Sequence, residues 1–393
     1  MLNETGASNE APIIEMPSTA DDLHSRLRAA VDEVFFVEFE NDDLPAPMTA
    51  TYTGRLLIDS MAAYDKLDAA FAPLDHLPIL AAEGDRQVVR AVRGRINPPP
   101  RSWLPNLVLL ILTIFSLLFV GALSESADFG SVLDLLRGLP YAVGVLLILG
   151  SHELGHYFAA RYHKVSVTLP YFIPLPVPGS FGTLGAFIQL RQPMRNRRVL
   201  LDVGAAGPLI GLIVAIPILL IGLKTSPLLS SSVPLTDLFM LRTPTVSYAI
   251  EGNSILYALA KIVVFGHFVP DGLHDVFINQ LAWAGWTGLL VTAINLIPVG
   301  QLDGGHIAYS LFGERARIVY LPLLVLLGVL SLFYEGWILW IFLLLLLGRV
   351  YATPLDSITK LDRRRQIIAV VSLVMFVLVF MPLPLQIITI GAR

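Results

Sequence analysis

The stretch LGSHELGHYFAA, from Leu149 to Ala160, places His152, Glu153 and His156 inside an apolar run long enough for a membrane-spanning helix. The two histidines are four residues apart, which puts both imidazoles on one face of a helix. Ionisable residues at membrane depth are costly and mark function by default. His-Glu-x-x-His on a helix is a zinc-site spacing with a built-in base. The alternative, two buried histidines bonded to neighbouring helices, is disfavoured by the glutamate between them.

The composition indicates a polytopic membrane protein. Of the 393 residues, 55% are hydrophobic and 15% are charged, whereas a soluble protein has about a quarter charged residues. The mean hydropathy is +0.68. The net charge of −4 gives no indication of a nucleic-acid partner. The chain has no cysteine, so any metal must be bound by His, Asp or Glu.

Residues 1–100 are polar enough to form a soluble α/β domain. The first residues have neither a basic nor an apolar segment, so we expect no cleavable signal peptide. Periodicity predicts helices over 20–34 and 61–74, and strands over 35–40, 51–59, 76–83 and 86–96. The stiff stretch INPPPRS, 96–102, marks the boundary. Without a cluster of catalytic residue types, we expect a regulatory or docking domain.

Residues 101–393 are predicted to form a membrane-embedded domain with six to eight transmembrane helices, seven being preferred. Residues 254–269 are interpreted as an interfacial or partly buried helix, and the short sixth span could pair with its neighbour as a hairpin. Basic residues accumulate before the first span and after the second, which places the N-terminus in the cytoplasm. These basic clusters could instead bind lipid or substrate. We expect a multi-pass protein of a bacterial plasma membrane. The seven predicted spans are 103–123, 138–160, 199–223, 281–298, 320–334, 337–350 and 367–390.

Two histidines do not complete a zinc site, and the stretch NLIPVGQLDGGH, from Asn295 to His306, offers a third ligand. The second and fourth spans run in the same direction. Pro298 and Gly300 break the fourth helix, which lets Asp303 fold back to the depth of the histidines. The alternative for Asp303 is an ordinary helix cap at the membrane surface. His306 is an alternative fourth ligand, although we favour a supporting or packing role.

These motifs resemble the site-2 protease family of intramembrane zinc metalloproteases, peptidase family M50. The resemblance rests on His152-Glu153-Leu154-Gly155-His156, on Asn295-x-x-Pro298 and on Leu302-Asp303-Gly304. It implies one Zn²⁺ per chain, bound by His152, His156 and Asp303. It also implies that Glu153 is the catalytic acid and base, and that Asn295 positions or stabilises the reacting carbonyl.

Two further stretches, GTLGAF (182–187) and AGPLIG (206–211), are similar to the subgroup found in cyanobacteria and plastids. The segments 164–198 and 224–280 are too short for the PDZ domain that many bacterial members carry. Gly204, Gly207 and Gly211 provide small residues for close packing of the third span beside the catalytic helix.

Residues 165–190 lie between the second and third spans, on the side of the predicted site. Four prolines keep the first half out of a helix, and FGTLGAFIQL reads as a strand after a Gly-rich turn. We expect a short β-hairpin near the active site. An exposed edge of that hairpin could hold an unwound substrate. We weigh this hypothesis evenly with a purely structural hairpin that makes no contact with substrate.

The predicted function is a zinc metalloendopeptidase that cleaves membrane-tethered proteins in or near their transmembrane segments. The expected partners are a membrane-spanning protein substrate and the lipid bilayer. One alternative is an ion or metal transporter that uses the same His, Glu and Asp residues, but transporters usually have repeated halves and a polar path. A second alternative is a metal-binding scaffold without activity, which the intact Glu153 disfavours.

Overall fold

The computed structural model describes residues 19–125, 130–230 and 246–390. It divides the chain into two compact units, each continuous in space but not in sequence. The first unit is Met1–Asn97 with Pro354–Lys360, and the second is Pro98–Thr353 with Leu361–Arg393. The N-terminal 18 residues and parts of two predicted outer loops, 126–129 and 231–245, lie outside the described residues.

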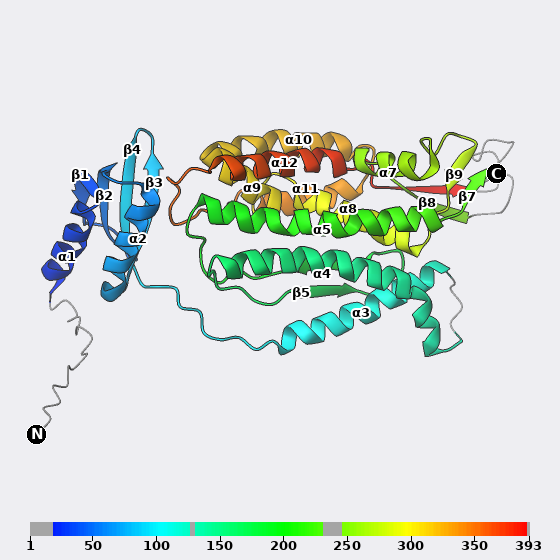
Figure 1. Cartoon of the computed structure of the whole chain (residues 1–393), viewed down its shortest axis with the longest axis horizontal. Helices are drawn as coiled ribbons and strands as arrows, with labels where there is room; N and C mark the ends of the chain where they lie inside the picture. Colours follow the sequence, from blue (N-terminus) through cyan, green and yellow to red (C-terminus); the bar gives the residue numbers. More distant parts are fainter. Residues whose placement is uncertain (1–18, 126–129, 231–245, 391–393) are drawn as a thin grey trace, which may run out of the picture. The chain divides into compact units, whose positions relative to one another are not determined.

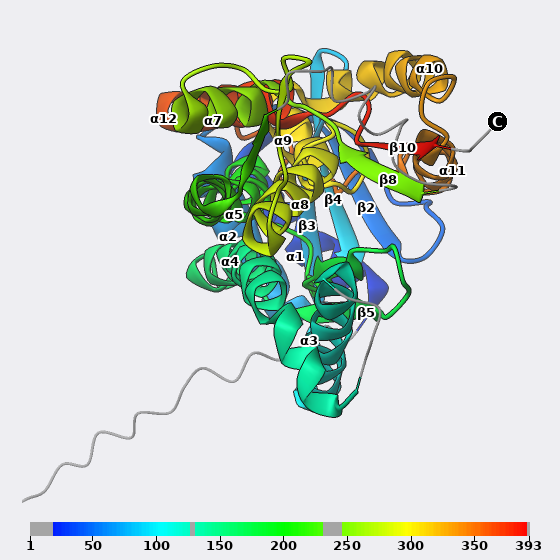
Figure 2. The ribbon, with the colours of Figure 1, turned by 90° about the vertical axis from the view of Figure 1, so that its right-hand side faces the viewer.

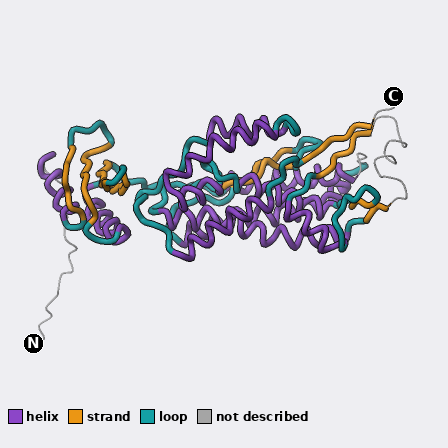
Figure 3. Tube along the Cα trace, turned by 90° about the horizontal axis from the view of Figure 1, so that it is seen from above, coloured by secondary structure: helices purple, strands orange, loops and turns teal. Residues whose placement is uncertain are grey.

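The first unit contains a four-stranded antiparallel sheet in the order β1-β2-β4-β3. Its strands are drawn in orange and its helices in purple in Figure 3. Every helix and strand that periodicity predicted here is confirmed. The buried residues Leu27 and Val31 of the first helix and Leu67 and Phe71 of the second pack on a core that includes Tyr52. The elements are α1 (Ala20–Asp32), β1 (Phe35–Asn41), β2 (Met48–Leu56), α2 (Ser60–Phe71), β3 (His76–Glu83) and β4 (Arg86–Arg93).

The segment Pro354–Lys360 belongs to this first unit although it lies some 270 residues further along the chain. Leu80 of β3 donates its amide to the carbonyl of Leu355 over 2.7 Å, and its own carbonyl accepts the amide of Ser357 at 2.9 Å. The segment thus adds a short parallel bridge beside β3. This pairing was not predicted, because two segments so far apart in the chain leave no local pattern in the sequence.

Asp356 is fully buried within that segment. Its carboxylate accepts the amides of Ile358 at 2.9 Å and Thr359 at 3.0 Å, and it also bonds the Thr359 hydroxyl. That hydroxyl lies 2.6 Å from the hydroxyl of Ser60, at the start of α2. Burial has the largest effect on the Asp356 carboxyl and raises its pKa above the ordinary value. The hydrogen bonds from Thr359 and Ile358 lower the pKa by less than burial raises it.

The second unit is mostly helical, and α4 packs against both α5 and α3 (Figure 1). Among its described residues, three stretches are long and apolar enough to cross a membrane: Leu104–Glu125, Val132–Tyr162 and Arg197–Thr225. The other helices are shorter, so the predicted total of seven spans stays a prediction. The helices of this unit are α3 (Leu104–Glu125), α4 (Leu139–Tyr162), α5 (Arg197–Thr225), α7 (Ile255–Phe265), α8 (Gln280–Asn295), α9 (Asp303–Phe312), α10 (Tyr320–Leu330), α11 (Gly336–Leu347) and α12 (Arg363–Val379).

Small residues allow α4, α5 and α8 to approach closely. A Cβ added at Gly144 of α4 would lie 2.7 Å from the Cβ of Ala284 in α8. A Cβ at Gly285 of α8 would lie 2.6 Å from the Cα of Leu219 in α5. In lipid, where apolar burial does not drive helix association, such close backbone packing is the main source of attraction.

The prediction of one apolar span over 367–390 is wrong beyond residue 379. The helix α12 ends at Val379, and Leu385–Ile390 forms β10, which pairs antiparallel with β8 (Val246–Glu251). Pro382 and Pro384 both lack the amide that a helix would need and disfavour its continuation, and β8 supplies a partner strand from elsewhere in the sequence. The helix expected within 254–269 is confirmed as α7, which packs beside α12 (Figure 2).

The predicted β-hairpin is confirmed. Its strands are β5 (Tyr171–Leu175) and β6 (Gly182–Phe187), which pair antiparallel. Gly179 and Gly182 in the connection have φ of +79° and +74°, a conformation that favours glycine. The proline-rich first half of residues 165–190 is not helical, as expected, and part of it forms β5, which pairs with β6.

Candidate metal centre

The helix α4 carries His152, Glu153 and His156 into the interior of the second unit. Their exposed fractions are 3%, 4% and 5%. Both imidazoles lie on the same helical face because one turn separates them. Such burial is unfavourable for polar side chains unless they are paired or bind a metal.

Asp303 reaches the histidines because the chain reverses sharply after α8. That helix ends at Asn295, and Gly300 has a φ of +64° before α9 begins at Asp303. The next residue, Gly304, lies so close to the preceding turn that a Cβ there would be 2.0 Å from the carbonyl oxygen of Leu296. The break that the sequence predicted is therefore present, and it returns Asp303 to α4.

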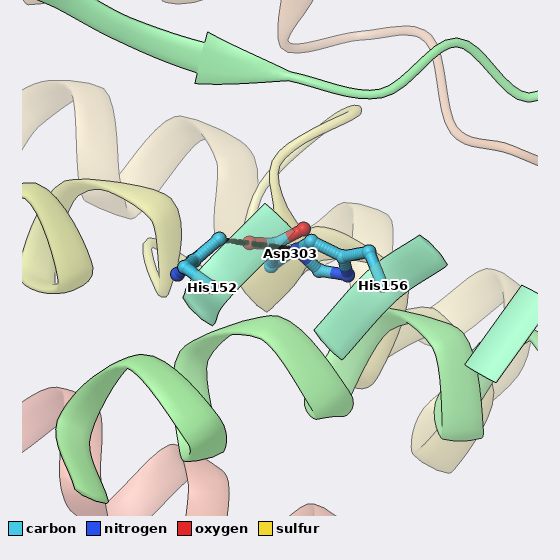
Figure 4. Close-up of side chains that lie close together, drawn as sticks. All are labelled: His152, His156 and Asp303. Atoms are coloured by element: carbon cyan, nitrogen blue, oxygen red, sulfur yellow. Dashed lines mark hydrogen bonds and ion pairs between the residues drawn. The ribbon is translucent and has the colours of Figure 1, made fainter. Parts of the chain in front are cut away.

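The three predicted ligand atoms form a nearly equilateral triangle. The Nε2 atoms of His152 and His156 are 3.1 Å apart, and each lies 3.2 Å from Oδ2 of Asp303. Figure 4 shows the three side chains converging from α4 and α9. Ligands of a tetrahedral zinc ion, with bonds of about 2.0–2.2 Å, lie roughly 3.3–3.6 Å apart. The triangle is therefore close to the size that zinc needs.

The hydrogen bonding of His156 also suits a metal ligand. Its Nδ1 lies 2.7 Å from the carbonyl oxygen of Val203 in α5, so Nδ1 carries the proton and donates it. Nε2 then presents a lone pair toward Oδ2 of Asp303, which is also an acceptor. Two acceptors that face one another at this distance fit a shared cation, and a carbonyl partner for the other ring nitrogen is usual in histidine metal sites.

Glu153 lines the same cavity as the three ligand atoms. The cavity has a volume of about 230 Å³, and Ala186, Phe187 and Ile188 bring the end of β6 to its wall. A buried carboxylate beside a metal and an open space is placed to exchange a proton with a reacting molecule.

Two further predicted residues lie at the site. The Nδ2 of Asn295 is 3.4 Å from Nε2 of His152, and both Asn295 and His306 line the cavity. The Nδ1 of His306 is buried and has no hydrogen-bond partner in the described part of the chain. The possible ligand atoms that lie close together at this site belong to His152, His156 and Asp303. His306 is not part of this triangle.

The glycines of α5 fit the site closely, as the sequence predicted. A Cβ at Gly211 would lie 3.2 Å from the ring of His152. A Cβ at Gly204 would lie 2.9 Å from the Cβ of His306. The Val203 carbonyl, by contrast, was not predicted, because a backbone acceptor has no sequence signature.

A cluster of charged side chains ties together the ends of α4, α5 and α12. Asp202 of α5 accepts two hydrogen bonds from the guanidinium of Arg365, at 2.8 and 2.6 Å. It also pairs with Nε2 of His163, directly after α4, at 2.8 Å. Because Asp202 precedes Val203, this cluster lies next to the backbone that orients His156.

Comparison with known families identifies a match to the model of peptidase family M50 over residues 140–330. The matched region contains all the predicted site residues. No solved structure matches this chain.

Several plant proteins are similar to the chain. A protein of Oryza sativa subsp. indica named "Probable zinc metalloprotease EGY2, chloroplastic" is 32% identical over 317 residues, covering 78% of this chain and 55% of that protein. The Arabidopsis thaliana protein of the same name is 30% identical, covering 77% of this chain and 53% of that protein. "Probable zinc metalloprotease EGY1, chloroplastic" of Arabidopsis thaliana is 33% identical, covering 62% of this chain and 43% of that protein. The chain thus spans about half the length of the curated relatives that it matches.

Proposed function

Because residues 140–330 are a domain of peptidase family M50, we propose that the protein is an intramembrane zinc metalloendopeptidase. The observation that carries this proposal is the convergence of His152, His156 and Asp303 within 3.2 Å of one another, with Glu153 on the wall of the same cavity. The names of the plant relatives support zinc as the metal and proteolysis as the reaction. The comparisons give no support to a transporter.

We assign one catalytic Zn²⁺ per chain to His152, His156 and Asp303. When bound, zinc lowers the pKa of water to about 7 and polarises a carbonyl. Glu153 would take the proton from the attacking water and deliver it to the departing amine. Asn295, 3.4 Å from the ring of His152, would donate its amide to the reacting carbonyl oxygen.

The substrate we propose is a membrane-spanning protein, cleaved in or near its transmembrane segment. A helical substrate shields its carbonyls, so cleavage requires an unwound segment. One edge of β6 pairs with β5. No described strand pairs with the opposite edge of β6. The end of β6 lies on the cavity wall. An unwound substrate could therefore add to the free edge of β6 and pass beside Glu153.

We also propose the membrane arrangement of the chain. The three long apolar helices and the shorter ones after them form a multi-pass domain in the bilayer, with seven spans preferred. The basic residues around these helices favour a cytoplasmic N-terminus. The first unit then acts as a cytoplasmic regulatory or docking domain. The named relatives are chloroplastic, and a bacterial plasma membrane remains our prediction for this chain.

The decisive experiment compares wild type with Glu153→Gln, each expressed in membranes. We expect Glu153→Gln to retain zinc, measured by mass spectrometry of the metal, and to accumulate an uncut single-span protein in the membrane proteome. The matched control is Glu335→Gln, an exposed glutamate of the same unit. Unchanged cleavage by Glu153→Gln would remove Glu153 from the mechanism, and zinc-dependent ion flux in liposomes would favour the transporter.

A photo-crosslinker tests the substrate path. Phe187 is 48% exposed and lines the cavity, so benzoylphenylalanine at this position in Glu153→Gln should capture the uncut substrate. The control position is Phe342 of α11, which is 62% exposed but does not line the cavity. Equal capture at both positions would argue against the β6 edge.

A further inference from the structure

A second group of metal-binding residue types lies in the loop after α7 and at the first residue of β9 (His274–Val276). It consists of His267, Asp271 and His274, whose candidate ligand atoms all lie within 4.8 Å of one another. The three side chains are 45%, 36% and 38% exposed. The donor set, two histidines and one aspartate, is that of the catalytic centre, but here the donors are in contact with solvent.

This group is remote from the catalytic centre. In register, His274 pairs with Ser230 of β7 (Leu228–Ser230), which follows the C-terminal end of α5. The catalytic histidines contact α5 near Gly207 and Gly211. At 1.5 Å per residue, the helix from Gly211 to Thr225 separates the two groups by about 20 Å.

The loop holds the Asp271 carboxylate in a fixed orientation. Its Oδ1 accepts the backbone amides of Leu273 at 3.0 Å and His274 at 2.6 Å. The amide of Asp271 in turn donates to the carbonyl of His274 at 3.1 Å. These bonds leave Oδ2 directed toward the two imidazoles. A carboxylate positioned in this way needs little reorganisation to bind a cation.

The hydrogen bonding of His267 directs a lone pair toward that oxygen. Its Nδ1 lies 3.1 Å from the carbonyl oxygen of Phe265, so Nδ1 donates and Nε2 is the acceptor. Nε2 lies 3.8 Å from Oδ2 of Asp271, which is beyond a hydrogen bond. Two ligands of one zinc ion, each about 2.0–2.2 Å from the metal, can lie this far apart when their angle exceeds the tetrahedral value.

The third donor completes the group. Nδ1 of His274 lies 2.8 Å from Oδ2 and 3.1 Å from Oδ1 of Asp271. The rings of His267 and His274 meet edge to face, with centroids 5.6 Å apart. Both imidazoles thus turn toward the same carboxylate. Without a cation His274 donates a proton to Asp271, whereas with one the same nitrogen is free to act as a ligand.

We infer that His267, Asp271 and His274 bind one exchangeable divalent transition-metal ion, of the zinc class, separate from the catalytic metal. Water completes the coordination because the donors are exposed. Binding ties the loop to the β7–β9 pair at the end of α5. The chain has no cysteine that could offer a competing thiolate site.

Equilibrium dialysis of the purified full chain against micromolar Zn²⁺ tests this inference. We expect wild type to bind two zinc ions, one retained after dialysis into metal-free buffer and one released. His267→Ala should bind the released zinc at least about tenfold more weakly and keep the retained one. The matched control is His24→Ala. His24 lies 3.7 Å from Asp42 and has no third possible ligand in the described part of the chain. This variant should bind both zinc ions as wild type does.

Hydrogen exchange provides a second readout that does not depend on activity. Zn²⁺ should slow exchange of the Leu273 and His274 amides in wild type, because the metal immobilises the carboxylate that accepts them. In His267→Ala these amide bonds remain possible, so their exchange should no longer respond to Zn²⁺. If His267→Ala binds the exchangeable zinc as wild type does, or if wild type binds only the retained zinc, the inference is overturned.

Discussion

Gly207 of α5 lies directly against the imidazole of His156, so that a Cβ at position 207 would be only 2.1 Å from Nε2. The glycine therefore leaves room for the His156 ring, which packs directly against the backbone of α5.

Gly207→Ala should abolish or strongly reduce zinc binding and proteolysis. The new methyl group would overlap Nε2, and either the imidazole or α5 must move. Metal content of the purified variant, measured by mass spectrometry, checks this expectation. The control is Gly150→Ala in α4, where a Cβ would meet nothing within 4 Å. That variant should keep zinc and gain up to about 1 kcal/mol of stability. A Gly207→Ala protein with full zinc content would show that the ring has space to shift.

Asp303→Ala should weaken zinc binding by more than the 10–100-fold that loss of a supporting partner costs. The reason is that Oδ2 of Asp303 lies 3.2 Å from both imidazoles and is the third corner of the triangle. Competition with a chelator measures the affinity. Asp85→Ala, an exposed turn residue of the first unit, is the control. Full occupancy in Asp303→Ala under the same chelator would count against its role as a ligand.

Arg365→Gln should lower the free energy of unfolding of the full chain by roughly 1–3 kcal/mol. Hydrogen bonds to a charged group contribute about this much to stability. It removes two donors from the half-buried Asp202 and leaves that carboxylate with His163. The control is Arg363→Gln, an exposed arginine at the start of the same helix. Because Asp202 adjoins Val203, we also expect weaker zinc binding. Equal stability of the two variants would mean that the Asp202–Arg365 pair contributes nothing measurable.

Asp356→Asn should be at least as stable as wild type at neutral pH. Burial raises the pKa of the Asp356 carboxyl in the folded chain. Its contribution to stability is therefore fully present below the unfolded pKa, about 3.9, and is lost as the pH rises through the folded pKa. Asparagine resembles the protonated acid at every pH, and its Oδ1 can still accept the amides of Ile358 and Thr359.

The measurement for Asp356→Asn is hydrogen exchange of the Leu80 and Ser357 amides, compared with wild type at matched pH. The advantage of the variant should grow from acid to neutral pH. Asp43→Asn, an exposed position, should follow wild type throughout. An advantage that shrinks toward neutral pH would contradict the raised pKa.

Local patterns predicted much of this protein. Alternation and helical periodicity were sufficient for the helices and strands of residues 20–93, because most of them bury one face. The site followed from residue types and spacing, since His152 and His156 share a helical face and Pro298 and Gly300 break the helix before Asp303.

Non-local pairing set the limits of prediction. Hydropathy extended the last span to residue 390 because Leu385–Ile390 is apolar, yet β8 pairs with it as a strand. The bridge between Leu80 and Asp356 joins residues far apart in the chain. The Val203 carbonyl and the Phe265 carbonyl orient histidines through backbone atoms, which every residue possesses and no motif marks.

The membership of Pro354–Lys360 in the first unit means that the polypeptide passes between the units three times, after Asn97, after Thr353 and after Lys360. A protease cut in the linker beyond Asn97 would consequently not free the N-terminal fragment, since the bonds of Leu80 to Leu355 and Ser357 still hold it. Deletion of residues 1–97 would likewise remove the partners of the 354–360 segment, leaving unpaired backbone groups just ahead of α12. Each unit is therefore built from two separate stretches of the chain, and no single cut of the polypeptide separates one unit from the other.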